Sequence, residues 1–85
     1  MIRILIGDDN LQMSDTLRRS VEQDADRKVC GETVNGGDAV QRAKETNPDL
    51  IILDFQMPVM NGLQAAFEIA KVTPDVPVLL RTANL

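Results

Sequence analysis

Short apolar runs that alternate with helical patterns constrain the fold of this chain most. The runs at 2–7, 50–54 and 78–82 are apolar on successive residues, as in strands that are buried on both faces. Between them, apolar residues recur every three or four positions, which predicts amphipathic helices over 11–23, 38–46 and 62–72. A weaker strand is predicted over 28–34. This alternation favours βαβ units, so we expect an α/β fold with a doubly wound parallel sheet.

Each predicted helix is expected to turn one apolar face toward the sheet. The expected faces are Met13, Leu17 and Val21 in the first helix, Ala39, Val40 and Ala43 in the second, and Leu63, Ala66, Phe67 and Ala70 in the third. Phe55 and Phe67 are the only aromatic residues, so the core is expected to be aliphatic, with Phe67 part of it. Cys30, in the weaker strand, is expected to be a buried, unreactive apolar residue.

Size and charge narrow the classes of protein to which the chain can belong. Its 85 residues make one small domain. The formal net charge of −4 and the lack of a basic cluster weigh against binding of nucleic acid or of an anionic membrane surface. The sequence has no apolar stretch long enough to span a bilayer, and its single cysteine cannot form an intrachain disulfide. We therefore expect a cytoplasmic protein.

Acidic residues stand at the ends of two predicted strands. Asp8 and Asp9 follow the run 2–7, and Asp54 ends the run 50–54. Parallel strands end at the same edge of a sheet, where open α/β sheets place their binding sites. We therefore expect the three carboxylates to converge there. By themselves, Asp8 and Asp9 are also typical of a pair that caps the following helix.

Converging carboxylates repel one another, and a hard divalent cation relieves that repulsion. Oxygen ligands without His or Cys favour Mg²⁺, with Mn²⁺ as a possible substitute. Because Mg²⁺ takes only one or two protein carboxylates, another carboxylate is free to attack phosphorus, and Asp54 suits that role. Thr82 can offer its hydroxyl and Ala83 its backbone N–H to a phosphoryl group. Thr82 alone is more typical of an ordinary residue at a strand end.

Taken in chain order, these motifs resemble the receiver domain of bacterial two-component response regulators. The matching segments are Ile4-Leu5-Ile6-Gly7-Asp8-Asp9, Asn35-Gly36-Gly37-Asp38-Ala39-Val40, Pro48-Asp49-Leu50-Ile51-Ile52-Leu53-Asp54, Met57-Pro58-Val59-Met60-Asn61-Gly62 and Pro77-Val78-Leu79-Leu80-Arg81-Thr82-Ala83. The resemblance covers essentially the whole chain. It implies a flavodoxin-like receiver fold, here shortened to about (βα)3β with strand order 2-1-3-4.

The resemblance also implies a role for each site residue. Asp54 would accept the phosphoryl group, and Thr82 and the Ala83 N–H would bind it. Asp9, Asp54 and the backbone carbonyl of Gln56 would bind Mg²⁺, with Asp8 contributing mainly through water. The phosphoryl donor would be a phosphohistidine on a sensor histidine kinase or a small phosphodonor, because the chain itself contains no His.

The family continues beyond the motifs seen here with a fourth helix, a fifth strand that ends in a Lys, and a fifth helix. We therefore expect residues 1–85 to form one receiver domain that is truncated after the fourth strand. That strand then becomes an apolar edge, which favours a homodimer through it. Arg81 is unusual for the family at its position. It is expected to limit open-ended strand pairing or to pair with an acidic group across an interface.

Two other functions fit parts of the sequence. A vestigial receiver would act as a dimerisation or interaction module without phosphorylation, which the missing Lys favours. A phosphatase with an aspartyl nucleophile usually has a second acid two residues after it, but that position is Gln56. The preferred interpretation is therefore Mg²⁺-dependent phosphoryl acceptance in a phosphorelay, by a signalling domain that is not a turnover enzyme.

Overall fold

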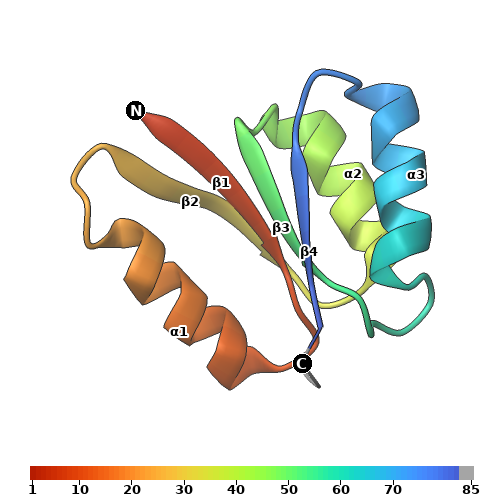
Figure 1. Cartoon of the computed structure of the whole chain (residues 1–85), viewed down its shortest axis with the longest axis horizontal. Coiled ribbons are helices and arrows are strands. Elements are labelled where there is room, and N and C mark those ends of the chain that lie inside the picture. Colours follow the sequence, from red (N-terminus) through yellow and green to blue (C-terminus); the bar gives the residue numbers. More distant parts are fainter. Residues whose placement is uncertain (83–85) are drawn as a thin grey trace.

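A four-stranded parallel sheet forms the centre of the molecule (Figure 1). The structure is a computed structural model that describes residues 1–82. The strands lie in the order β2-β1-β3-β4. The elements are β1 (Ile2–Gly7), α1 (Leu11–Glu22), β2 (Arg27–Thr33), α2 (Gly36–Thr46), β3 (Leu50–Asp54), α3 (Gly62–Val72) and β4 (Val78–Arg81). The predicted doubly wound fold and strand order are confirmed.

Helices cover both faces of the sheet. Figure 1 shows α1 on one side and α2 beside α3 on the other. The helix boundaries follow from capping. Asn10 accepts a hydrogen bond from the Met13 backbone N–H at the start of α1, and Asn35 does the same for Asp38 in α2. Because Asn35 is the cap, α2 begins at Gly36, two residues earlier than the sequence predicts. None of the helices in residues 1–82 is long and apolar enough to cross a membrane.

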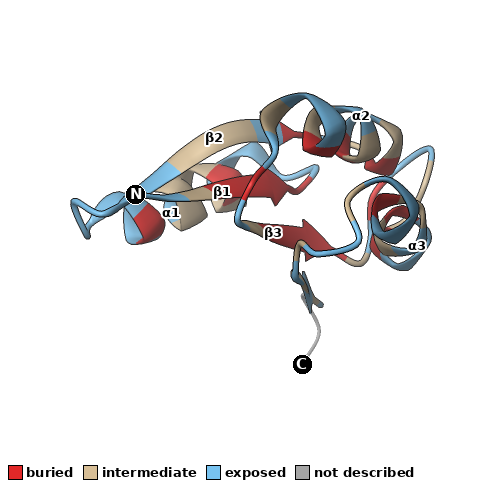
Figure 2. Cartoon of the chain, turned by 90° about the horizontal axis from the view of Figure 1, so that it is seen from above, coloured by how far each residue is buried: buried red, intermediate tan, exposed pale blue. Residues whose placement is uncertain are grey.

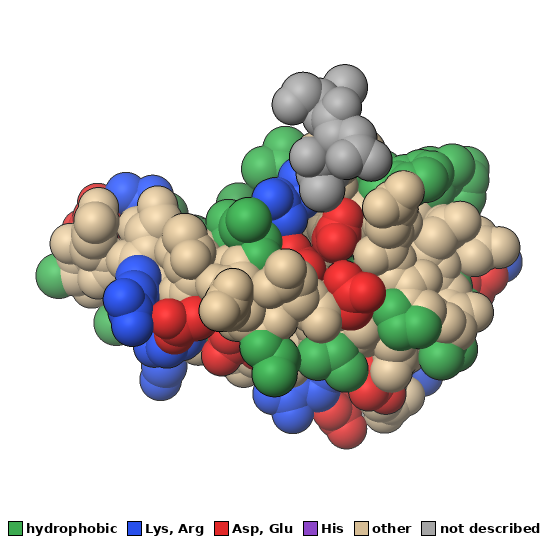
Figure 3. Space-filling model, turned by 90° about the horizontal axis from the view of Figure 1, so that it is seen from below, with side chains coloured by type: hydrophobic (Ala, Val, Ile, Leu, Met, Phe, Trp, Pro, Cys, Tyr) green, Lys and Arg blue, Asp and Glu red, His purple; other side chains and the backbone are tan. Residues whose placement is uncertain are grey.

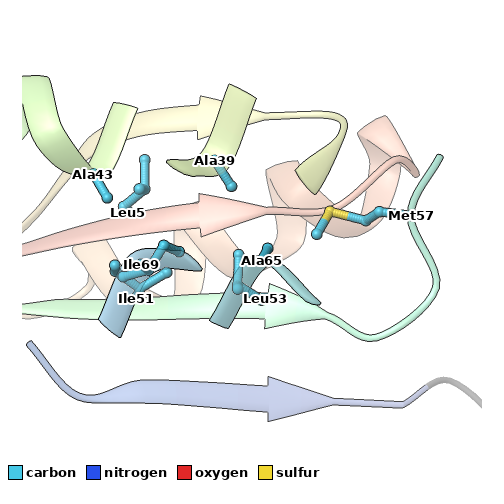
Figure 4. Close-up of a cluster of buried hydrophobic side chains, with 8 residues drawn as sticks. All are labelled: Leu5, Ala39, Ala43, Ile51, Leu53, Met57, Ala65 and Ile69. Carbon is cyan, nitrogen blue, oxygen red and sulfur yellow. The ribbon is translucent and has the colours of Figure 1, made fainter. Parts of the chain in front are cut away.

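The larger core lies between the sheet and the pair α2 and α3. Figure 4 shows side chains of β1 and β3 facing small residues of the two helices. Alanines on the helices let them approach the strands closely, and aliphatic side chains fill the space. The eight residues are Leu5, Ala39, Ala43, Ile51, Leu53, Met57, Ala65 and Ile69. A smaller core under α1 contains Ile4, Ile6, Val21 and Ile52. Both cores are aliphatic, as predicted.

The buried face of α3 is not the predicted one. The sheet covers Gly62, Ala65 and Ile69, while Phe67 is 65% exposed and Leu63 is also exposed. Figure 2 shows the division between the buried and exposed sides of this helix. The helix is apolar on two faces, so periodicity alone does not select one. Contact between Gly62 and the end of β3 selects the face that contains Gly62, Ala65 and Ile69.

A bulge in β2 explains the position of Cys30. Ile4 pairs with Val29, and the next residue of β1, Leu5, pairs with Gly31, so Cys30 is the extra residue on β2. Its side chain is only partly buried, where full burial is predicted, and it packs against the larger core.

Strand β4 lies at one edge of the sheet formed by residues 1–82 and pairs with β3. Two of its apolar side chains are open to solvent: Leu79 is 56% exposed and Leu80 is 36% exposed. The strand ends at Arg81, so Thr82 follows it rather than closing it.

Candidate functional site

The pairing of β1 with β3 brings the three carboxylates together. Gly7 pairs with Leu53, so Asp8 and Asp54 occupy neighbouring positions at the C-terminal edge of the sheet. Oxygen atoms of Asp8, Asp9 and Asp54 all lie within 4.8 Å of one another. The convergence predicted from the sequence is therefore present. Figure 3 shows acidic side chains gathered at this edge of the molecule.

Asp8 is the most deeply buried of the three, with 1% of its surface exposed. One carboxylate oxygen accepts a hydrogen bond from the Asn10 backbone N–H at 2.9 Å. The other accepts one from Arg81 Nη1 at 2.7 Å. Burial raises the pKa of the Asp8 carboxyl above its ordinary value. The Asn10 N–H and the Arg81 guanidinium offset part of that rise, while the Asp54 and Asp9 carboxylates add to it.

Asp54 is the last residue of β3 and is 7% exposed. Its carboxylate accepts a hydrogen bond from the Gln56 backbone N–H at 3.3 Å. In the part of the chain that is described, the ion pair in this cluster joins Arg81 to Asp8 and does not include Asp54. Asp9 is exposed. Among residues 1–82, the cluster thus contains three acidic groups and one cationic partner, and its charge is only partly neutralised.

Arg81 belongs to this site, and the sequence analysis did not place it there. In the register of β3 with β4, Arg81 is the partner of Asp54, and its side chain reaches Asp8 at the end of β1. Within the chain it pairs with Asp8, and its expected roles in limiting strand pairing or in pairing across an interface stay predictions. The signal was present in the sequence, because a buried carboxylate requires a cation and Arg81 ends the strand beside Asp54.

The carboxylates line a cavity of about 210 Å³. Its walls are formed by Asp8, Asp9, Asn10, Met13, Asp54, Gln56 and Arg81. Ligands on opposite sides of a Mg²⁺ ion are about 4 Å apart, since each Mg–O bond is about 2.0–2.1 Å. Carboxylate oxygens within 4.8 Å of one another, without His or Cys, therefore suit a hard cation of this size.

The remaining predicted site residues differ in how the structure places them. Gln56 lines the cavity, although its hydrogen bond to Asp54 comes from its N–H, and ligation by its carbonyl stays a prediction. Thr82 is exposed and is not one of the residues that line the cavity. Ala83 lies outside the described residues.

The loop 55–61, which carries Gln56, is held at both ends. Met57 is 8% exposed and inserts into the larger core. The Gly62 N–H donates to the Phe55 carbonyl at 2.8 Å, and Asn61 caps α3 in a reciprocal capping box with Gln64. Between these anchors, Val59 has φ of 70°, which is unfavourable for a β-branched residue. The loop is thus anchored at both ends, with one strained residue between the anchors.

The fold and the site define a doubly wound α/β domain with an acidic cavity at the C-terminal edge of its sheet. Residues 4–85 match the family described as the response regulator receiver domain. The chemotaxis protein CheY of Thermotoga maritima is 38% identical over 81 residues, which are 95% of this chain and 67% of that protein. The chain therefore belongs to the response regulator receiver family.

Two further similar proteins support this family assignment. A protein-glutamate methylesterase/protein-glutamine glutaminase of Methanosarcina mazei is 41% identical over 80 residues, which are 94% of this chain and 22% of that protein. The crystal structure of the response regulator domain of Thermotoga maritima CheB superposes with a TM-score of 0.93 at 34% identity. That match covers 98% of this chain and 61% of the solved one. The chain spans about a fifth of the methylesterase that it matches.

Proposed function

We propose that this domain accepts a phosphoryl group on Asp54 in a two-component phosphorelay, with Mg²⁺ as the preferred cofactor and Mn²⁺ as a substitute. The observation that carries the proposal is the position of Asp54: a nearly buried carboxylate at a strand end that lines an acidic cavity beside two more carboxylates. Asp8, Asp9, Asp54 and the Gln56 carbonyl would hold the cation. When bound, it would neutralise charge on the carboxylates and on the transferring group.

The chemistry of the transfer follows from the carboxylate. An oxygen of Asp54 attacks phosphorus and forms the new O–P bond, while the N–P bond of a phosphohistidine breaks. The imidazole leaves with the electron pair of that bond and retains or takes up a proton. The Thr82 hydroxyl and the Ala83 N–H would donate hydrogen bonds to the phosphoryl oxygens. The domain stores the group as an aspartyl phosphate and does not act as a turnover enzyme.

The proposed donor is a sensor histidine kinase. The chain has no His, so a phosphohistidine must be supplied by another protein. Membership in the receiver family supports this type of partner and a cytoplasmic location. The net charge of −4 supports the expectation that this chain does not itself bind nucleic acid.

We also propose a homodimer through the edge of β4. The exposed Leu79 and Leu80 and the unpaired edge of the strand in residues 1–82 support it. Gel filtration with light scattering should give the mass of two chains, and Leu79→Lys should give the mass of one. A wild-type chain that is monomeric at micromolar concentration would exclude this dimer.

Phos-tag electrophoresis tests the phosphorylation itself. The wild-type chain should form a retarded band with acetyl phosphate and Mg²⁺, and both Asp54→Asn and excess EDTA should abolish that band. A folded wild-type chain that shows no retarded band with acetyl phosphate or with any histidine kinase tested would leave the non-phosphorylated interaction module as the remaining function.

A further inference from the structure

Arg81 lines the acidic cavity and supplies it with a built-in cation. Its guanidinium donates to the Asp8 carboxylate at 2.7 Å, and its side chain is only 26% exposed. Asp8 is 1% exposed and sits beside Asp9 and Asp54, so the pair lies inside the carboxylate cluster rather than on the open surface. A pair in such a place is screened much less than an exposed one.

The backbone around Arg81 fixes this position. The Arg81 carbonyl accepts a hydrogen bond from the Phe55 N–H at 2.9 Å, which locks the end of β4 against the residue after Asp54. The side chain then extends across the end of β3 to reach the residue that follows β1. Arg81 is therefore held by its strand at the same edge as the proposed metal ligands.

We propose that Arg81 is a tethered competitor of the divalent cation and sets the affinity of the cavity for Mg²⁺ and Mn²⁺. The proposal rests on the proposed function, because the cation is the one that phosphoryl acceptance requires. Two cations meet in one cavity of about 210 Å³. The guanidinium takes one oxygen of Asp8 from the cluster and repels a second positive charge that enters it.

The size of the effect follows from Coulomb's law. A singly charged and a doubly charged cation about 6 Å apart repel each other. With screening as strong as that of bulk water, this repulsion is roughly the energy of a tenfold change in affinity. Arg81→Met removes the charge and keeps an apolar stem of similar length. We therefore expect it to bind Mn²⁺ about tenfold more tightly than the wild type, as an order-of-magnitude value from the same relation.

The experiment compares four versions of the 85-residue chain: the wild type, Arg81→Met, Arg81→Lys and Arg27→Met. Arg27 is the matched control, since it forms an ion pair with Asp24 at 3.3 Å and the change in net charge is the same. Free Mn²⁺ is measured by electron paramagnetic resonance during titration, and Mg²⁺ is measured by competition. Thermal unfolding is recorded in EDTA and in saturating Mg²⁺. Circular dichroism confirms that each variant is folded, and Arg81→Gln replaces Arg81→Met if the latter is not.

The outcomes separate this proposal from the proposed function. Tighter Mn²⁺ binding by Arg81→Met alone supports competition. A lower unfolding midpoint of that variant in EDTA, with a larger gain from Mg²⁺, supports it further because Asp8 has then lost its only cationic partner among the described residues. Equal or weaker Mn²⁺ binding by Arg81→Met overturns the competition and leaves phosphoryl acceptance standing. If no chain binds either metal, the competition and the metal dependence of the proposed function both fail. The Phos-tag result then shows whether phosphoryl acceptance fails as well.

Discussion

Gly62 lies directly against the carbonyl oxygen of Asp54: a Cβ at position 62 would stand 2.3 Å from it. No side chain fits at position 62 without moving the end of β3 or the start of α3. The same relationship recurs between Gly36 and the loop, where a Cβ would stand 2.0 Å from the Met60 carbonyl oxygen. Two glycines thus let the starts of two helices close around the end of β3 and the loop that follows it.

Gly62→Ala should lower the free energy of unfolding by about 2 kcal/mol, since the added methyl group forces backbone apart. It should also weaken Mg²⁺ binding, because Asp54 and Gln56 lie on the segment that must shift. Urea denaturation followed by circular dichroism measures the stability. Gly37→Ala is the matched control, since the nearest atom to its Cβ is 3.4 Å away. Equal effects of the two substitutions would contradict the close contact.

Val59→Asn should stabilise the domain by about 1 kcal/mol, because Asn tolerates the left-handed conformation that a β-branched residue disfavours. Val59 is 87% exposed, so its removal sacrifices little packing. Urea denaturation measures the change. Val72→Asn, at an exposed position near the end of α3, serves as the control and should give no gain. A loss of stability in Val59→Asn would show that the loop does not adopt the positive φ in solution.

Ile69→Ala should destabilise the domain by about 3 kcal/mol, whereas Phe67→Ala should cost less than about 1 kcal/mol. Ile69 is fully buried against the sheet and Phe67 is 65% exposed. The comparison determines directly which face of α3 meets the core. Chemical denaturation of the two variants under identical conditions is sufficient. A larger loss for Phe67→Ala would support the face expected from the sequence or a contact of Phe67 with another molecule.

Mg²⁺ should raise the thermal unfolding midpoint of the wild type, since a ligand that binds only the folded state stabilises it. Asp9→Asn should lose most of this rise. Asp9 is exposed and its charge is repelled by its neighbours, so the midpoint of the variant in EDTA should not fall. Asp75→Asn is the control. It removes an exposed acidic group in the loop before β4, so the variant should keep the full rise in the unfolding midpoint. An undiminished rise in Asp9→Asn would remove Asp9 from the metal site.

The pKa of Asp24 should lie below its ordinary value of 3.8, because the Asp26 backbone N–H and then the Arg27 side chain bind its charged form. A lowered pKa means that the unfolded state binds more protons. The contribution of Asp24 to stability is therefore complete above pH 3.8 and is lost as the pH falls through the lower, folded value. Carboxyl-carbon NMR titration measures the pKa directly. Arg27→Met should move it upward, and a value at or above 3.8 in the wild type would contradict the two contacts.

Periodicity and strand-end chemistry predicted the fold and the meeting of Asp8, Asp9 and Asp54. The fold and this convergence were predictable because each strand and its following acidic residues form a local sequence pattern, and parallel strands end at the same edge of the sheet. The face of α3 was not predictable, because Leu63 and Phe67 make its outer side as apolar as its inner side. Arg81 was missed for a different reason. The need of a buried carboxylate for a cation pointed to Arg81, but its partner Asp8 follows β1 at the other end of the chain. The choice of that partner depends on the registers of β1 with β3 and of β3 with β4.

The bond between Arg81 and Asp8 spans 73 positions of the sequence. Every residue from Asp8 to Arg81 must therefore be synthesised before the two can meet, and the entropy of closing so long a loop opposes their meeting. Until β4 docks, the carboxylates of β1 and β3 face each other without their arginine. The repulsion among these carboxylates is therefore partly relieved only when β4 pairs with β3.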